Sequence, residues 1–130
     1  INNSINIVPI IFYLGAIFWT LGFDTIYGYQ DIKDDEIIGV KSTSIKFKKN
    51  PKIFISLCYS LFFASLIILG ILMNYKILYF VSLSLTFYHL IVYQINNLNV
   101  NDAKECLQKF KSNNFLGLVV FINILIGKIL

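Results

Sequence analysis

Long stretches without a charged side chain constrain this chain most strongly. No charge occurs in the first 23 residues, Lys52 and Lys76 enclose 23 uncharged positions, and Lys76 and Asp102 enclose another 25. One Asp or Lys at mid-membrane costs roughly 2.5–3.5 kcal/mol, and a spanning helix needs about 20 apolar residues. The composition agrees, since 57% of the residues are hydrophobic and the mean hydropathy is +0.72. We therefore expect an all-α integral membrane helical bundle in a lipid bilayer.

The apolar runs predict four transmembrane helices. The expected spans are about 5–23, 53–73, 77–95 and 115–130. The pair Asn50-Pro51 predicts a helix start, because Asn is a frequent cap and Pro is tolerated in the first turn. A tight turn is expected at 74–76, and Lys128 is expected to extend from the short fourth span towards the membrane surface.

The lysines predict the orientation of the bundle. All eleven basic residues are Lys, and the net charge is +4. With four spans, the polar segments 24–52 and 99–114 share one side and carry nine of these lysines, whereas Lys76 and Lys128 lie on the other. Positive loops stay in the cytoplasm, so we expect both segments there, in a bacterial inner membrane. The excess charge then reflects topology, and no nucleic-acid partner is expected.

Several polar or reactive side chains lie within the apolar runs. Cys58 lies in such a run but Cys106 in the polar segment 99–114, so they should sit at different depths and no disulfide is expected. His89 and Asn123 are interpreted as neutral groups hydrogen-bonded inside the bundle rather than as functional groups. Trp19 is typical either of an interfacial belt or of aromatic packing.

The second polar segment is expected to contain a short amphipathic helix. Ala103, Leu107 and Phe110 share one face by helical spacing. Lys104, Gln108 and Lys111 face elsewhere. This helix would lie on the bundle or on the lipid headgroups.

The first polar segment concentrates negative charge. Five of the seven acidic residues of the chain fall between Asp24 and Glu36. The segment is expected to be helical, either as an extension of the first span or as a short separate helix. On one helix, the following residues would form a single stripe at offsets 0, 3, 7, 10 and 11: Asp24, Tyr27, Asp31, Asp34 and Asp35.

Asp31 and Asp35 have the spacing of a divalent-cation site. They are one helical turn apart, about 6 Å along the axis. Mg²⁺ favours one or two carboxylates, several waters and phosphate oxygens, and it acts as a Lewis acid on a leaving group. Lys41 is a candidate to bind the phosphate as a point charge. The alternatives are a solvated acidic cap and a lysine that serves topology alone.

Residues 23–35 and 38–44, FDTIYGYQDIKDD and IGVKSTS, closely resemble the second aspartate-rich motif of UbiA-type prenyltransferases. The pattern there is Tyr-Asp-Thr-x-Tyr-Ala-x-x-Asp-x-x-Asp-Asp followed by Ile-Gly-x-Lys-Ser-Thr, with Phe23 replacing the Tyr and Gly28 the Ala. Residues 106–117 resemble the late cytoplasmic loop of the same family. Within the family, the segment is most similar to the 4-hydroxybenzoate polyprenyltransferase branch of ubiquinone biosynthesis.

The resemblance implies a bundle of about nine helices around a lipid-facing chamber. It implies that Asp31 and Asp35 hold Mg²⁺ on the diphosphate, that Asp24 and Tyr27 line the same pocket, and that Lys41 contacts the diphosphate. The implied reaction transfers a polyprenyl group from an allylic polyprenyl diphosphate to a ring carbon of 4-hydroxybenzoate. The diphosphate leaves, the ring carbon attacks the allylic cation, and a ring proton is lost.

The family's first motif, an Asn and Asp cluster, and about five spans are not found in this sequence. Residues 1–130 are therefore expected to form the C-terminal half of the domain, to need the N-terminal half as a partner and to be inactive alone. Two alternatives remain open at this point. One is another UbiA branch with a naphthoate or porphyrin acceptor, and the other is a non-catalytic small membrane protein whose acidic loop binds a cation.

Overall fold

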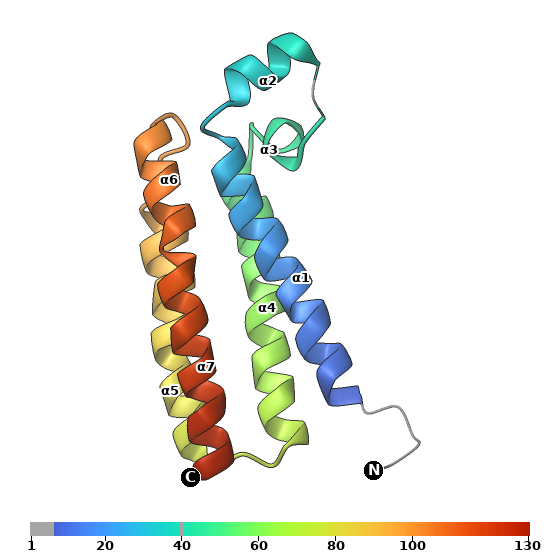
Figure 1. Ribbon diagram of the computed structural model, residues 1–130, viewed down its shortest axis with the longest axis vertical. Coiled ribbons are helices and arrows are strands. Elements are labelled where there is room, and N and C mark those ends of the chain that lie inside the picture. The colour runs from blue at the N-terminus through green and yellow to red at the C-terminus, as the bar shows by residue number, and fades with distance from the viewer. Residues whose placement is uncertain (1–6, 40) are drawn as a thin grey trace.

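The computed structural model describes residues 7–39 and 41–130, which fold into helices joined by turns (Figure 1). Residues 5 and 6 of the expected first span lie outside the described residues. The elements are α1 (Ile7–Gly28), α2 (Ile32–Ile38), α3 (Thr43–Lys46), α4 (Pro51–Leu72), α5 (Ile77–Phe87), the π-helix η1 (Tyr88–Asn96), α6 (Ala103–Lys111) and α7 (Asn113–Ile129).

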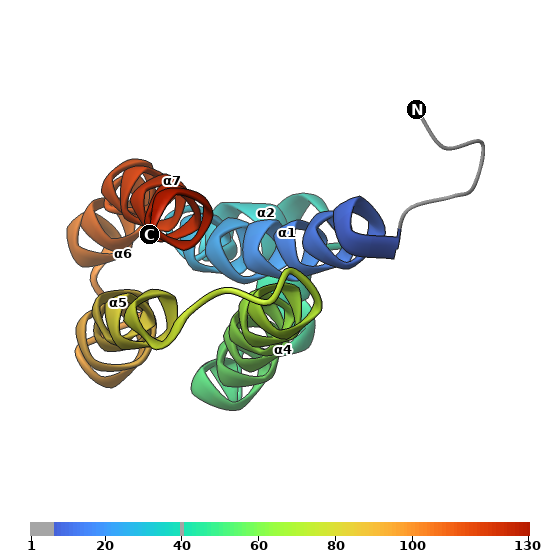
Figure 2. The same cartoon turned by 90° about the horizontal axis from the view of Figure 1, so that it is seen from below.

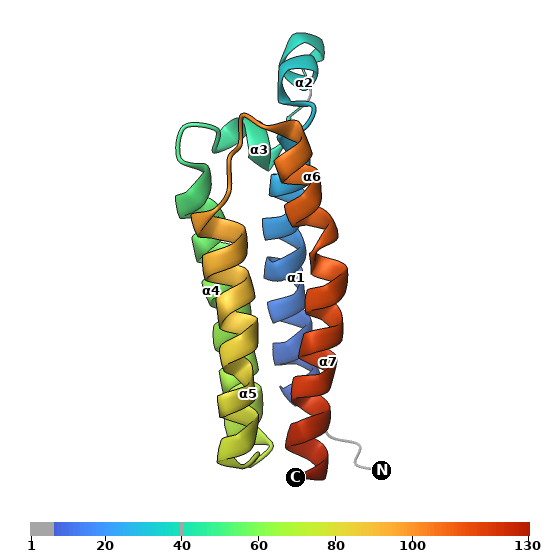
Figure 3. The ribbon, with the colours of Figure 1, turned by 90° about the vertical axis from the view of Figure 1, so that its left-hand side faces the viewer.

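Within the described residues, four stretches are long and apolar enough to cross a membrane: Ile7–Gly28, Pro51–Leu72, Ile77–Asn96 and Ala103–Ile129. A helix of 22 residues rises about 33 Å, which matches the hydrocarbon thickness of a bilayer. They stand side by side in one bundle, in which α1 packs mainly on α4 and α5 on α7 (Figure 2). The expectation of an all-α bundle with four spans is confirmed. The short helices α2 and α3 lie at one end of the bundle, with α2 projecting furthest (Figure 3).

Small residues allow α1 and α4 to approach closely. A Cβ atom at Gly22 would lie 2.5 Å from Cε1 of Tyr59, and one at Gly15 would overlap with Ser65. Tyr59 and Leu66 of α4 are fully buried at this interface. Close backbone approach at small residues is the usual way in which membrane helices gain packing energy.

The helix boundaries follow local signals. Pro51 occupies the first turn of α4, although the Asn50 side chain makes no capping hydrogen bond. The turn after α4 contains Asn74 with a φ of 56°, a left-handed conformation that Asn tolerates better than most residues. The sequence did not predict that the third span changes from α-helix to π-helix at Tyr88.

The π-helix places His89 and Gln94, five residues apart, on one stripe. Gln94 Nε2 lies 3.1 Å from His89 Nδ1. Gln94 Nε2 also donates to Asn113 Oδ1 at 2.9 Å, and Trp19 Nε1 donates to the same oxygen at 2.9 Å. Tyr59 completes the network by donating to Gln94 Oε1. This buried network joins all four spans.

The hydrogen bonds expected for the isolated polar residues are present. His89 is hydrogen-bonded inside the bundle, and Asn123 donates to Thr86 Oγ1 at 2.6 Å. Cys58 and Cys106 are free and buried. Trp19 takes the packing role, since its ring stacks on Phe62 with centroids 5.1 Å apart.

The amphipathic helix expected in the second polar segment is present as α6, with Leu107 and Phe110 half-buried and Lys104, Gln108 and Lys111 exposed, but its buried face was predicted only in part. The buried residues are Cys106 and Lys109, whereas Ala103 is exposed. Lys109 is buried because its ammonium pairs with Glu105 at 2.9 Å and lies 3.9 Å from the centre of the Tyr93 ring. A buried charge is tolerated when such partners replace its water.

Candidate functional site

The acidic segment does not continue α1. The backbone amides of residues 29–31 donate three residues back, at 3.2–3.3 Å, and this tight turn ends the helix at Gly28. A new helix, α2, begins at Ile32 with Asp31 at its N-cap. Of the two expected forms, the short separate helix is correct. The single stripe of acidic residues is therefore broken at this turn.

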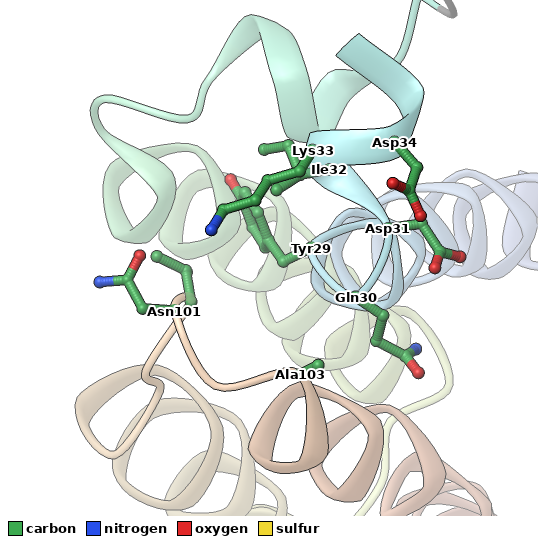
Figure 4. Close-up of a pocket in the computed structure, with 9 residues that line it drawn as sticks. Tyr29, Gln30, Asp31, Ile32, Lys33, Asp34, Asn101 and Ala103 are labelled. Atoms are coloured by element: carbon green, nitrogen blue, oxygen red, sulfur yellow. The ribbon is translucent and has the colours of Figure 1, made fainter. Parts of the chain in front are cut away.

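A cavity of about 360 Å³ lies between this turn and the loop that precedes α6 (Figure 4). Its lining consists of Tyr29, Gln30, Asp31, Ile32, Lys33, Asp34, Val100, Asn101 and Ala103. The carboxylates of Asp31 and Asp34 extend to the same side, while Lys33 extends towards Asn101 (Figure 4). The half-buried Asp35 is not among the lining residues. The cavity thus brings Asp31 together with Asp34.

The other expected site residues lie in separate places. Asp24 lines a shallow hollow along the exposed face of α1, together with Tyr13 and Thr20. Lys41 lines a third hollow around α3. Tyr27 is 45% exposed, and its ring centre lies 4.6 Å from that of Phe110. The described residues alone do not gather these groups into one pocket.

A divalent metal fits the donors at this end of the bundle only in part. Among residues 7–39 and 41–130, no three side chains of His, Cys, Asp or Glu come together as a closed metal site. Mg²⁺ needs only one or two carboxylates when waters and phosphate oxygens supply the remaining ligands. The carboxylates of Asp31 and of its neighbours on α2 provide that number, so the donor set suits a metal that arrives with a diphosphate.

Two features of the site escaped sequence reasoning. Thr25 and Ser44 are buried and hydrogen-bond α1 to α3, and their only signal was a cluster of small hydroxyl residues near Asp24 and Lys41. The second feature is the Tyr29 hydroxyl, which is buried without a hydrogen-bond partner among the residues that the structure describes. Burial, with a smaller contribution from Cys106, raises the pKa of Tyr29 to about 12.

Membrane-spanning helices with a carboxylate-bearing helical cap at one end agree with the architecture that the resemblance to UbiA-type prenyltransferases implies. Residues 1–125 match the UbiA prenyltransferase family, and the chain belongs to this family. Members generally depend on a divalent metal ion. No solved structure matches the chain.

Among curated proteins, the chain is similar to enzymes named for 4-hydroxybenzoate. It is 36% identical over 118 residues to the mitochondrial 4-hydroxybenzoate polyprenyltransferase of Dictyostelium discoideum. This match covers 91% of this chain and 25% of that protein. It is 35% identical over 130 residues to the enzyme of the same name in Drosophila melanogaster, covering 99% of this chain and 33% of that protein. The 4-hydroxybenzoate geranyltransferase 1 of Lithospermum erythrorhizon is 36% identical over 117 residues, covering 90% of this chain and 38% of that protein. The chain thus spans between a quarter and two fifths of the length of these relatives.

Proposed function

We propose that this chain forms part of a membrane-bound prenyltransferase that transfers a polyprenyl group from an allylic polyprenyl diphosphate to 4-hydroxybenzoate, a step of ubiquinone biosynthesis. The observation that carries the proposal is the 35% identity to the Drosophila melanogaster 4-hydroxybenzoate polyprenyltransferase along 130 residues. The family membership favours an enzyme over a non-catalytic small membrane protein. The names of the relatives favour 4-hydroxybenzoate over a naphthoate or porphyrin acceptor.

We propose that Asp31 and Asp35 hold Mg²⁺, with Asp34 sharing the cavity beside Asp31. The metal, when bound, supplies Lewis-acid stabilisation of the departing diphosphate. Asp31 is exposed and α2 has no buried residue, which supports access from water. Carboxylates so close to one another would repel without a cation.

Asp24, Tyr27 and Lys41 are proposed to face the same substrate from other sides. Because Asp24 and Lys41 line hollows of their own, the pocket must be completed by further protein. The partner proposed here is the N-terminal half of the same enzyme, which carries the remaining spans of the domain and the first Asn and Asp motif. Residues 1–130 alone are then inactive.

We propose that the acidic end of the bundle faces the side of the membrane on which nine of the eleven lysines gather. In the bacterial inner membrane expected from the sequence, this side is the cytoplasm. Two of the three relatives carry mitochondrial names, which favour a mitochondrial membrane instead. The number of spans determines which loops share a side in either case.

The proposal is tested with the full-length protein in membranes, a radiolabelled prenyl diphosphate and 4-hydroxybenzoate, with and without Mg²⁺. Asp31→Ala and Asp35→Ala are expected to abolish Mg²⁺-dependent transfer while leaving membrane insertion intact. Glu36→Ala is the matched control, because Glu36 is an acidic residue of the same helix that pairs with Lys48 at the surface, at 2.8 Å. Unchanged turnover in both aspartate variants would refute the metal assignment.

Asp34→Ala separates the two possible carboxylate pairs. The cavity joins Asp31 to Asp34, whereas the one-turn spacing joins Asp31 to Asp35. If the metal uses the one-turn pair, Asp34→Ala retains most of its activity. If activity falls as far as in Asp31→Ala, the cavity pair is the one that matters.

A further inference from the structure

Three hydroxyl side chains fasten α3 to the end of α1. Ser44 Oγ donates to the backbone oxygen of Thr25 at 2.7 Å, and Thr25 Oγ1 lies 2.7 Å from Thr43 Oγ1. Thr25 is fully buried, and Ser44 is 2% exposed. Thr25 Oγ1 also donates to the Leu21 carbonyl at 2.7 Å, which fixes its rotamer. We call Thr25, Thr43 and Ser44 the hydroxyl latch.

The latch donates a hydrogen bond to a backbone carbonyl at the end of α1. The amide of Tyr29 donates to the Ile26 carbonyl, three residues back, as the last turn tightens. The carbonyl of Thr25, four residues back, accepts instead from Ser44. The last carbonyls of a helix need such outside partners, and here α3 provides one.

Glycine at position 28 makes this contact possible. A Cβ atom there would overlap with Ser44 Oγ and would lie 3.0 Å from Ser44 Cβ. Since Ser44 is buried between α1 and α3, it has little room to move away. Gly28 therefore leaves free the space that the Ser44 hydroxyl occupies.

The latch lies between two groups assigned to the substrate. Thr25 directly follows Asp24, and Thr43 lies two residues after Lys41. Helix α3 has only four residues, and its start is fixed by Ser42 Oγ, which accepts from the Ile45 amide at 3.2 Å. A helix this short is not stable by itself, so tertiary contacts must hold it.

Two other contacts hold residues that follow α3. Phe47 stacks on Phe54 with ring centres 4.0 Å apart, and Lys48 forms an exposed ion pair with Glu36. In the sequence, α3 separates both of these residues from Lys41. The latch is thus the buried contact nearest to Lys41 in the sequence.

We infer that Thr25, Thr43 and Ser44 are positioning residues that hold Lys41 beside the acidic end of the bundle, where it binds the diphosphate group of the prenyl substrate. This inference rests on the proposed function, which assigns Lys41 to the diphosphate. A lysine side chain is long and flexible, so fixing its backbone reduces the conformational entropy lost on binding. The latch supplies that fixed backbone by joining the lysine loop to the helix that carries Asp24.

The test uses the full-length enzyme in membranes and measures KM for the prenyl diphosphate, KM for the acceptor and kcat. Thr25→Val removes the hydroxyl and keeps the shape, whereas Thr25→Ser keeps the hydroxyl and serves as the conservative control. Thr25→Val should raise KM for the diphosphate roughly 3- to 10-fold, as expected for the loss of the hydrogen bond between the Thr25 and Thr43 hydroxyls. It should leave KM for the acceptor unchanged. Thr25→Ser should restore the wild-type value. Equal changes in both KM values would overturn the inference.

A double-mutant cycle with Lys41→Ala shows whether the latch acts through the lysine. Thr25→Val should add nothing to the effect of Lys41→Ala. Multiplicative effects would overturn the inference but leave the role of Lys41 in the proposed function intact. If Lys41→Ala alone leaves KM unchanged, the assignment of Lys41 fails together with the inference, while the metal test on Asp31 remains independent.

Hydrogen exchange provides a readout besides activity. Amides of residues 43–46 should exchange faster in Thr25→Val and in Ser44→Ala than in the wild type, with the amides of α4 unchanged. Unchanged exchange at 43–46 in both variants would overturn the inference. Faster exchange throughout α4 would also overturn it, because the latch would then serve general stability.

Discussion

The buried amide of Asn113 offers the sharpest test of how this bundle is held together. Its Oδ1 accepts from Trp19 and from Gln94, each at 2.9 Å. Its Nδ2 donates to Gln94 Oε1 at 3.3 Å and to the Lys109 and Phe110 carbonyls at 3.2 Å. Asn113→Leu keeps a similar shape and removes all of these hydrogen bonds.

The expected cost depends on the partners left behind. The substitution removes the hydrogen bond that Trp19 of α1 donates to Asn113 and the side-chain hydrogen bonds between Asn113 and Gln94 of η1. Hydrogen bonds between membrane helices average about 0.6 kcal/mol and reach about 1.7 kcal/mol, and a buried donor left without a partner costs about 1–3 kcal/mol. The Trp19 N–H becomes such a donor, whereas Gln94 keeps its bonds to Tyr59 and His89. We therefore expect Asn113→Leu to lower the free energy of unfolding by about 2 kcal/mol.

The measurement is reversible unfolding of the protein in mixed micelles with increasing denaturing detergent. Asn114→Leu is the matched control, because Asn114 is the same residue type one position further on and is exposed. Exposed substitutions of this kind change stability by less than about 0.5 kcal/mol. If Asn113→Leu costs no more than Asn114→Leu, the network does not hold the spans together and this reasoning is wrong.

Two further substitutions are predicted from burial and close contact. Tyr29→Phe should raise the free energy of unfolding by about 1 kcal/mol, since it removes a buried hydroxyl without a partner. Burial also raises the pKa of Tyr29 from 10.0 to about 12, because the folded protein disfavours the ionised phenol. The free energy of unfolding is therefore unaffected by this group below pH 10.0 and falls as the pH rises through 12. Alkaline unfolding curves should show this loss in the wild type and not in Tyr29→Phe. Gly22→Ala should cost about 1–3 kcal/mol in the same micelle assay, because its Cβ would lie 2.5 Å from the Tyr59 ring. Gly117→Ala is the control, since its Cβ would meet Trp19 at an ordinary 3.5 Å, and equal costs at the two glycines would contradict the packing argument.

The sequence predicted the spans well because their signal is one-dimensional. A charge within a lipid-embedded helix is costly wherever the helix packs, so uncharged runs alone locate the spans. The start of α4 at Pro51 and the turn at Asn74 likewise depend on the local backbone. The acidic segment was less certain, because the same spacing permits an extended α1 or the separate α2 that the structure shows.

The burial of Lys109 in α6 could not be predicted because it depends on a partner from another helix. Helical spacing favoured Ala103, Leu107 and Phe110, yet the structure buries Lys109. Its burial requires the ring of Tyr93, which comes from η1. A periodic pattern weighs each side chain by its own polarity and does not include such a partner.

The amino-acid sequence by itself determined that the chain crosses a membrane four times and concentrates its carboxylates at one end. Both properties are sums over neighbouring residues, namely the transfer energy of each run and the charge of each segment. Only the tertiary structure decided that Asp31 shares a cavity with Asp34, that Lys41 and Asp24 line hollows of their own, and that Thr25 and Ser44 join α1 to α3. These features depend on how separate helices dock, and docking is set by side-chain contacts between positions far apart in the chain.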